Sequence, residues 1–288
     1  MVDGWAYGVL AAFVFMVLCN GLASAGLLGG KTNKQISDEN PTYLSPDGQT
    51  FAIWGIIYTL ELVLVIAQLF PSESAEALLQ RESPMGLDVR QQMVLAFVIN
   101  GVWLPVFNNE YFWSSWVIIV VYLGFLLSIY TDVNTQTTEG LLEYLCYAAG
   151  ITLNCSWVVV ATCVSTFLNL GRVGWKDQNG VAGSVVAASV VIVLVALLAC
   201  QRALVVYDLV WAFGASWALM GIYRMQTVPD KVSLAQDENV ELGARADVDA
   251  VRFPPSAMNA NLGNLARGCS YLVIVAMVAG AALALFWK

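Results

Sequence analysis

Long apolar runs, separated by shorter polar segments, organise almost the whole chain. A transmembrane helix needs about 20 predominantly apolar residues, and each run reaches or approaches that length. Some runs are rich in Val and Ile, but a segment in lipid must satisfy its backbone groups internally, so we read every run as a helix. The runs lie at 5–28, 50–70, 91–109, 111–131, 141–169, 182–200, 203–222 and 264–287. The pattern predicts an all-α integral membrane protein with about eight transmembrane helices.

The polar segments between these runs alternate between the two sides of the membrane. Eight spans place both termini on one side and three long loops, 29–49, 170–181 and 223–263, on the other. The side of the loops carries eight Lys and Arg residues, against four on the side of the termini. By the positive-inside rule, we expect the three loops on the cytoplasmic side, or on the stromal side of an organelle. The lipid bilayer of a plasma or organelle membrane is therefore the first expected partner.

Composition narrows the class of protein further. Hydrophobic residues make up 59% of the 288-residue chain and charged residues 12%, about half the roughly 25% of a soluble domain. The net charge of −8 is opposite to what a protein bound to nucleic-acid phosphates needs, so nucleic acid is not an expected partner. The chain has no histidine, which excludes imidazole as a metal ligand, a haem ligand or a general base. The six cysteines form no C-x-x-C pair, so we predict no metal site.

Aromatic and amide residues recur at helical spacing in three of the runs, where they share one helix face. Each face lies toward loop 29–49, because the second run begins on that side and the third and fifth end there. Aromatic walls with a few amides beneath a loop suit a planar apolar ligand. Packing seams between helices are the alternative interpretation. The three faces are Phe51, Trp54, Tyr58 and Glu61; Asn100, Trp103 and Phe107; and Asn154, Trp157, Ala161 and Ser165.

Glu61 lies near the middle of the second run. A carboxylate inside a membrane is costly, which makes this residue a candidate proton-carrying or polar site. Two other interpretations stay open, namely that the carboxyl is neutral or that it is hydrogen-bonded to a neighbouring helix. No second charged residue is placed to complete an acid–base pair with it. We therefore assign no catalytic residue and expect no hydrolytic site.

Three motifs follow one another in register within the first 170 residues. Segment 45–58 reads SPDGQTFAIWGIIY, segment 100–107 reads NGVWLPVF, and segment 156–169 begins with Ser-Trp and ends with Leu-Asn. Together they resemble the TspO/translocator protein (TspO/MBR) family, the tryptophan-rich sensory proteins. The family's motifs are P-x-G-x-x-F with W-x-x-x-Y, N-x-x-W-x-P-x-F, and W-x-x-x-A followed by L-N. The chain has one residue fewer between Phe51 and Trp54 than short members, and three more spans after residue 181, so it resembles a longer branch.

The resemblance implies a division of the chain and a set of site residues. Residues 1–170 would form a five-helix ligand-binding core, and residues 171–288 would add three transmembrane helices with the long polar loop 223–263. Family members bind porphyrins and other tetrapyrroles, and in animals sterols. Carried over to this sequence, a lid would contain Tyr43, and the residues lining the pocket would be Trp54, Asn100, Trp103, Trp157 and Ala161.

Three functional hypotheses follow from these observations. The first is a membrane receptor or carrier that binds a hydrophobic planar small molecule, a porphyrin, another tetrapyrrole or a sterol-like lipid, in an aromatic-lined pocket under loop 29–49. The alternative is a structural accessory subunit of a larger membrane complex. The third is a membrane enzyme or transporter that uses Glu61 as a proton carrier; with no charged partner for that residue, an enzyme is not the expected class. No cofactor is required, and a bound porphyrin would be held without histidine ligation.

Small-xxx-small pairs such as Gly214 with Ala218 fit close helix approach within the bundle or in a homodimer.

Overall fold

The computed structural model describes residues 4–134, 137–227 and 258–286, in which helices are joined by turns and short loops. Residues 228–257 of the long loop predicted at 223–263 lie outside these ranges. The long helices are α1 (Gly4–Ser24), α3 (Ile53–Ala67), α5 (Val89–Asn108), α6 (Phe112–Asp132), α8 (Ala149–Arg172), α9 (Val185–Gln201), α10 (Leu209–Thr227) and α12 (Ala260–Phe286). The short elements are α2 (Asn33–Glu39), the 3-10 turn η1 (Gly48–Ala52), α4 (Glu73–Leu79), α7 (Leu141–Glu143) and the π-helical turns η2 (Tyr144–Ala148) and η3 (Arg202–Val206).

Seven helical stretches within the described residues are long and apolar enough to cross a membrane. They are α1, η1 with α3, α5, α6, α7 through α8, α9 with η3, and α12. The predicted all-α, multi-pass membrane fold is thus confirmed. The eighth predicted run corresponds to α10, which is not among the seven, because Arg224 and Gln226 lower the hydropathy of its last turns.

The start of α10 differs from the sequence prediction. Residues 202–206 continue the preceding helix as a π-helical turn, Tyr207 adopts a left-handed backbone with φ 59°, and α10 begins at Leu209 instead of residue 203. Asp208 caps the new helix, because its Oδ1 accepts a hydrogen bond from the Trp211 N–H at 3.1 Å. No Gly or Pro marks this break, and Asp208, a residue type that favours helix N-caps, was its one local signal.

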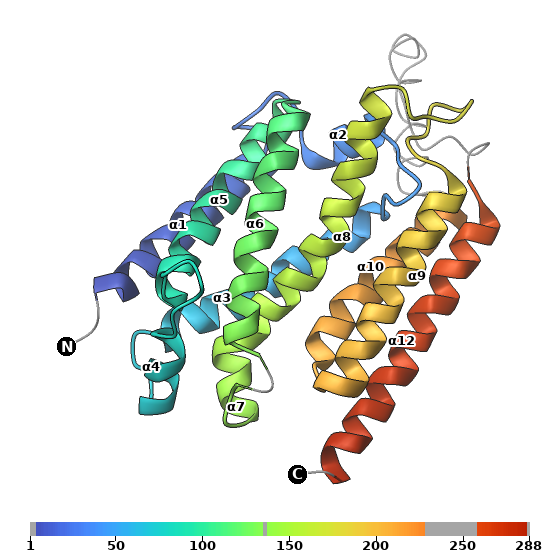
Figure 1. Cartoon of the computed structure of the whole chain (residues 1–288). Coiled ribbons are helices and arrows are strands. Elements are labelled where there is room, and N and C mark those ends of the chain that lie inside the picture. The colour runs from blue at the N-terminus through green and yellow to red at the C-terminus, as the bar shows by residue number, and fades with distance from the viewer. Residues whose placement is uncertain (1–3, 135–136, 228–257, 287–288) are drawn as a thin grey trace, which may run out of the picture.

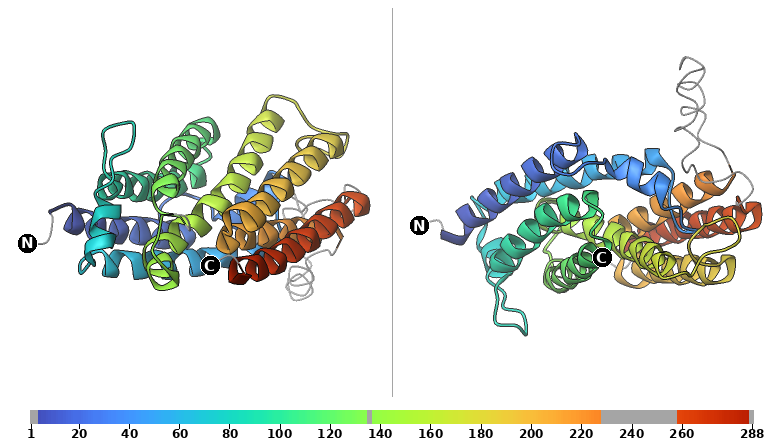
Figure 2. Two further views of the ribbon diagram at one scale, coloured as in Figure 1. Left: turned by 60° about the horizontal axis from the view of Figure 1, so that its bottom comes forward. Right: turned by 90° about the horizontal axis from the view of Figure 1, so that it is seen from above.

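The helices pack in a continuous series. α1 lies along α5, α5 on α6, and α6 on α8; α8 also contacts α3 and α10, and α10 contacts α9 and α12. Figure 1 shows α8 between the group that contains α1, α3, α5 and α6 and the group that contains α9, α10 and α12. The turned views in Figure 2 show the same two groups. One hydrophobic cluster runs through both, from Val9 of α1 to Ala276 of α12.

The eight long helices named above place both ends of the helical bundle's chain on one side of the molecule. The free ends of α1 and α12 point to the lower side of the bundle in Figure 1, and the segments that follow α1 and α8 lie at the upper side. Loops 29–49 and 170–181 therefore share one end of the molecule, as the alternation of apolar and polar segments requires. That this end faces the cytoplasm or stroma stays a prediction.

Candidate ligand-binding site

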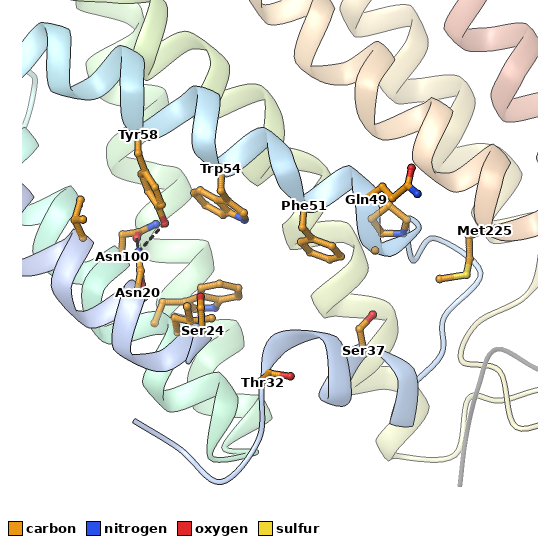
Figure 3. A pocket seen from close by; sticks show the side chains of 16 residues that line it. Asn20, Ser24, Thr32, Ser37, Gln49, Phe51, Trp54, Tyr58, Asn100 and Met225 are labelled. Carbon is orange, nitrogen blue, oxygen red and sulfur yellow. Dashed lines mark hydrogen bonds between the residues drawn. The ribbon is translucent and has the colours of Figure 1, made fainter. Parts of the chain in front are cut away.

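A cavity of about 820 Å³ lies between α1, α2, η1 with α3, and α5, and one residue of α10 contributes to its outer end (Figure 3). Sixteen residues line it, and none of them is charged. They are Val17, Asn20, Gly21, Ser24, Thr32, Ser37, Pro46, Gly48, Gln49, Phe51, Trp54, Tyr58, Asn100, Trp103, Leu104 and Met225. The space is therefore bounded by apolar rings, amides and hydroxyl groups.

Aromatic rings from η1, α3 and α8 meet beside this cavity. Trp54 stacks on Tyr58 with ring centroids 5.4 Å apart. Trp157 of α8 meets Trp54 edge-on at 6.3 Å, and it meets Phe51 edge-on at 5.8 Å. Such edge-to-face and offset arrangements fix the orientation of aromatic rings relative to one another. The rings form a preorganised wall.

Two smaller cavities lie against the same rings. One of about 70 Å³ is lined by Phe107, Trp157 and Ala161, and another of about 40 Å³ lies among the rings. Phe51 and Trp103 line all three cavities, so they stand at the boundary between the large space and the small ones. On α5, Trp103 stacks on Phe107 with centroids 5.4 Å apart. The structure thus brings together the aromatic residues that were predicted to share a site, and they come from η1, α3, α5 and α8.

A cluster of polar side chains closes the inner end of the large cavity. The Asn20 Nδ2 donates to the Tyr58 hydroxyl at 2.8 Å and to the Asn100 Oδ1 at 2.6 Å (Figure 3). The Oδ1 of Asn20 and the Nε1 of Trp103 are buried and have no hydrogen-bond partner among the described residues. Sequence reasoning missed Asn20, although an amide inside the first apolar run was a signal for it. Both unpartnered atoms belong to residues that line the cavity.

Glu61 lies outside the three cavities described above and is fully buried. Its Oε1 accepts a hydrogen bond from the Asn154 Nδ2 at 2.6 Å, and the same Nδ2 donates to the Tyr122 hydroxyl at 2.5 Å. Gly150 of α8 allows the close approach, because an added Cβ there would lie 2.8 Å from the backbone nitrogen of Glu61. Of the interpretations left open for Glu61, the geometry agrees with a carboxyl hydrogen-bonded to a neighbouring helix.

Helix α2 covers the side of the large cavity opposite α3 (Figure 3). Its first turn is closed by a capping box, in which Thr32 Oγ1 accepts from the Gln35 N–H and Gln35 Oε1 accepts from the Thr32 N–H. Ile36 is fully buried against Phe112 and Leu168, which belong to α6 and α8. The short helix is therefore fixed at its start and by an apolar anchor at its middle.

Tyr43, expected in a lid, lies in the segment after α2 but lines none of the three cavities. Its hydroxyl donates to Asp177 Oδ2 at 2.6 Å and its N–H donates to the Ala182 carbonyl at 3.3 Å. Burial, together with the bond to Asp177, raises the pKa of Tyr43 to about 12. Burial alone would raise the pKa of Asp177, but hydrogen bonds from Tyr43 and the Val181 N–H outweigh it and lower that pKa. Tyr43 joins loop 29–49 to the segment that follows α8.

No group of three His, Cys, Asp or Glu side chains that could hold a metal ion occurs among the described residues. The six cysteines are all unpaired thiols. The large cavity offers a ligand hydroxyl, amide and indole groups and one thioether, from Met225. These groups can form hydrogen bonds and van der Waals contacts.

Comparison with known proteins agrees with the motifs in the sequence. The model of the TSPO-like protein family matches residues 5–236, which spans α1 through α10 and so extends beyond the region of the three motifs. No curated protein matches the chain, and no solved structure matches it. Because the family model covers most of the sequence, the chain belongs to the TSPO-like protein family.

Proposed function

We propose that this membrane protein is a receptor or carrier that binds a hydrophobic planar ligand, a porphyrin, another tetrapyrrole or a sterol-like lipid, in the 820 Å³ cavity. Membership of the TSPO-like family and the seven apolar helices already make it a multi-pass membrane protein with a receptor- or transporter-type role. The identity of the ligand class is the part that we add. The single observation that supports it is the cavity walled by Phe51, Trp54 and Trp103 with amides at one end.

The size and lining of the cavity fit this ligand class. Ligand sites in proteins occupy about 300–1,000 Å³ and combine apolar walls with a few polar groups. Flat ring systems gain about 1 kcal/mol from a well-placed aromatic neighbour beyond the area they bury. The amide side chains of Asn20 and Asn100, which line the cavity, would orient a ligand that carries a hydroxyl, carbonyl or pyrrole group. A tightly packed helix seam, the alternative interpretation of the aromatic faces, would leave no space of this size.

The uncharged lining also constrains how a porphyrin would bind. No histidine, cysteine or carboxylate lines the cavity, so the macrocycle would be held by stacking and shape instead of through a metal. Ionised side groups would remain at the outer end, near Thr32, Ser37 and Gln49, since burying a charge without a partner is costly. The protein needs no resident cofactor for this role.

A titration of the purified protein with protoporphyrin IX tests the proposal. Binding is followed by the absorption band of the porphyrin, because that readout does not depend on the number of tryptophans. We expect Trp54→Leu and Trp103→Leu each to weaken binding about tenfold, the factor that ~1.4 kcal/mol corresponds to. Trp113→Leu is the matched control, since Trp113 is 51% exposed and lines none of the three cavities.

A competition series with a sterol then separates the two ligand classes. Displacement of the porphyrin by the sterol would place both in the same cavity. The proposal would be refuted if, for each probe, Trp54→Leu and Trp103→Leu bound with the same affinity as the wild type. That result would favour an accessory subunit.

A further inference from the structure

The outer end of the cavity is built by a short segment, Pro46–Phe51, which we call the mouth segment. Four of its six residues, Pro46, Gly48, Gln49 and Phe51, line the cavity. Most of it is the 3-10 turn η1, and no side chain caps the start of that turn. Turns of this kind have poorer hydrogen-bond geometry than an α-helix and rarely persist beyond three or four residues on their own. The position of the mouth segment therefore depends on what holds it from outside.

Helix α10 supplies these outside contacts. Arg224 forms a two-pronged ion pair with Asp47, since its Nε donates to Oδ2 and its Nη2 donates to Oδ1, both at 3.0 Å. The Nη2 of Arg224 also donates to Thr50 Oγ1 at 3.1 Å. Thr50 Oγ1 donates in turn to the same Asp47 carboxylate. Charge-assisted bidentate bonds of this type fix both distance and angle between their partners.

The backbone of the mouth segment is also bonded to α10. The Trp217 Nε1 donates to the Thr50 carbonyl at 2.8 Å, and the Asp47 N–H donates to the Gly221 carbonyl at 3.1 Å. Gly221 makes room for this contact, because an added Cβ would lie 2.9 Å from the Pro46 Cβ and even closer to the Thr50 side chain. One turn farther along, Met225 itself lines the cavity. Contacts from two turns of α10 thus converge on the same six residues.

The helix that makes these contacts is itself well fixed. Ser156 of α8 donates to the Trp211 carbonyl at 2.7 Å, and the hydroxyls of Ser216 and Ser270 lie 2.8 Å apart between α10 and α12. Gly214 faces Ser156 at a distance that leaves no space for a side chain. Because α10 is packed on both sides, it can act as a rigid support for the segment that it contacts.

We propose that Arg224 and Trp217 are positioning residues of the ligand cavity: they hold the mouth segment against α10 so that Phe51 stays in the aromatic wall. This inference rests on the proposed function. It assigns part of the binding site to the region after residue 170, which the motif-bearing helices do not include. The support consists of a charge-assisted ion pair and an indole hydrogen bond. Arg224→Gln removes the charge of the first, and Trp217→Phe removes the donor of the second while keeping an aromatic ring.

The test measures two quantities in Arg224→Gln, Asp47→Asn, the double variant and Trp217→Phe. The first is the affinity for protoporphyrin IX, and the second is amide hydrogen exchange of residues 46–52 without ligand. We expect each single variant to bind about tenfold more weakly, a difference of ~1.4 kcal/mol, and to exchange faster in that segment. The double variant should bind the porphyrin no more weakly than Arg224→Gln alone, because both substitutions break the same ion pair.

Arg267→Gln is the matched control, since Arg267 packs over the Tyr223 ring of α10 and donates to the Tyr223 hydroxyl, and Tyr223 is not part of the mouth segment. It should change neither quantity. Unchanged affinity of all four variants, or full additivity in the double variant, would overturn the inference while leaving the proposed function intact. Failure of the wild type to bind the porphyrin or a sterol would instead refute the proposed function. The exchange data would still decide whether α10 holds the mouth segment.

Discussion

The contact between α3 and α8 at Gly150 gives a prediction whose size follows from the geometry. A Cβ at residue 150 would lie 2.8 Å from the Glu61 nitrogen and 3.0 Å from the Leu60 carbonyl carbon. Both atoms are backbone, so no side-chain rotation can relieve the clash, and the two helices must move apart. Overpacking of this kind costs about 1–3 kcal/mol. The separation would also stretch the Asn154–Glu61 hydrogen bond and the Trp54–Trp157 contact, which join the same two helices.

The matched variant is Gly124→Ala on α6, where an added Cβ meets nothing within 4 Å. Both substitutions replace a helical glycine, so each gains about 0.5–1 kcal/mol of helix stability. The difference between the two variants therefore isolates the clash. For a chain of this size, about 1–3 kcal/mol corresponds to a difference of roughly 2–12 °C in Tm.

The assay is thermal unfolding of the two variants in the same detergent, together with porphyrin affinity. We expect Gly150→Ala to melt lower than Gly124→Ala and to bind the porphyrin more weakly, because the aromatic wall spans the strained contact. Equal melting temperatures would show that α3 and α8 do not approach as closely as the structure describes.

Three further predictions concern charge. Because no charged residue lines the cavity, the dimethyl ester of protoporphyrin IX should bind at least as tightly as the diacid in the absorption titration; a strong preference for the diacid would reveal an unrecognised cation in the site. Glu61→Gln should leave porphyrin affinity within about twofold of the wild type, since Glu61 lies outside the cavities and an amide can keep the bond to Asn154; a large loss would give Glu61 a direct role. The Arg90 guanidinium lowers the pKa of Glu76 below its ordinary value of 4.5, so the stability that this pair contributes is present above that value and is lost as the pH falls through the lowered pKa. The Tm of the wild type should therefore exceed that of Glu76→Gln at neutral pH and converge with it in acid; a constant difference at all pH values would contradict the pairing.

The sequence carried most of the information about helices and their faces. A run of about 20 apolar residues forms a helix in lipid, because only a helix satisfies its backbone groups internally. The spacing of Phe51, Trp54 and Tyr58 then fixes which side chains share a face. The number of spans then determines which loops lie at the same end. These properties depend only on local pattern, which is why the fold class could be predicted.

Other features had little or no local signal. The break at Tyr207 has no Gly or Pro, and only the neighbouring Asp208 marks it. The ion pair between Asp47 and Arg224 joins residues 177 positions apart, and neither residue stands out in its own segment. Tyr43 was placed near the cavity by resemblance, but its hydroxyl points to Asp177, which no periodic pattern could indicate. Contacts between segments that are distant in the sequence can be identified only from the three-dimensional structure.

The lining of the cavity has a consequence for biosynthesis. Val17 and Met225 border the same space, although about 200 residues separate them. At a synthesis rate of about 5–20 residues per second, the ribosome needs roughly 10–40 s to add the intervening stretch. Until residue 225 has been made, the part of the cavity formed by α1, α3 and α5 lacks its contribution from α10. Completion of the cavity is therefore a late event of synthesis, and a chain that stalls before residue 225 would lack the residue of α10 that lines it.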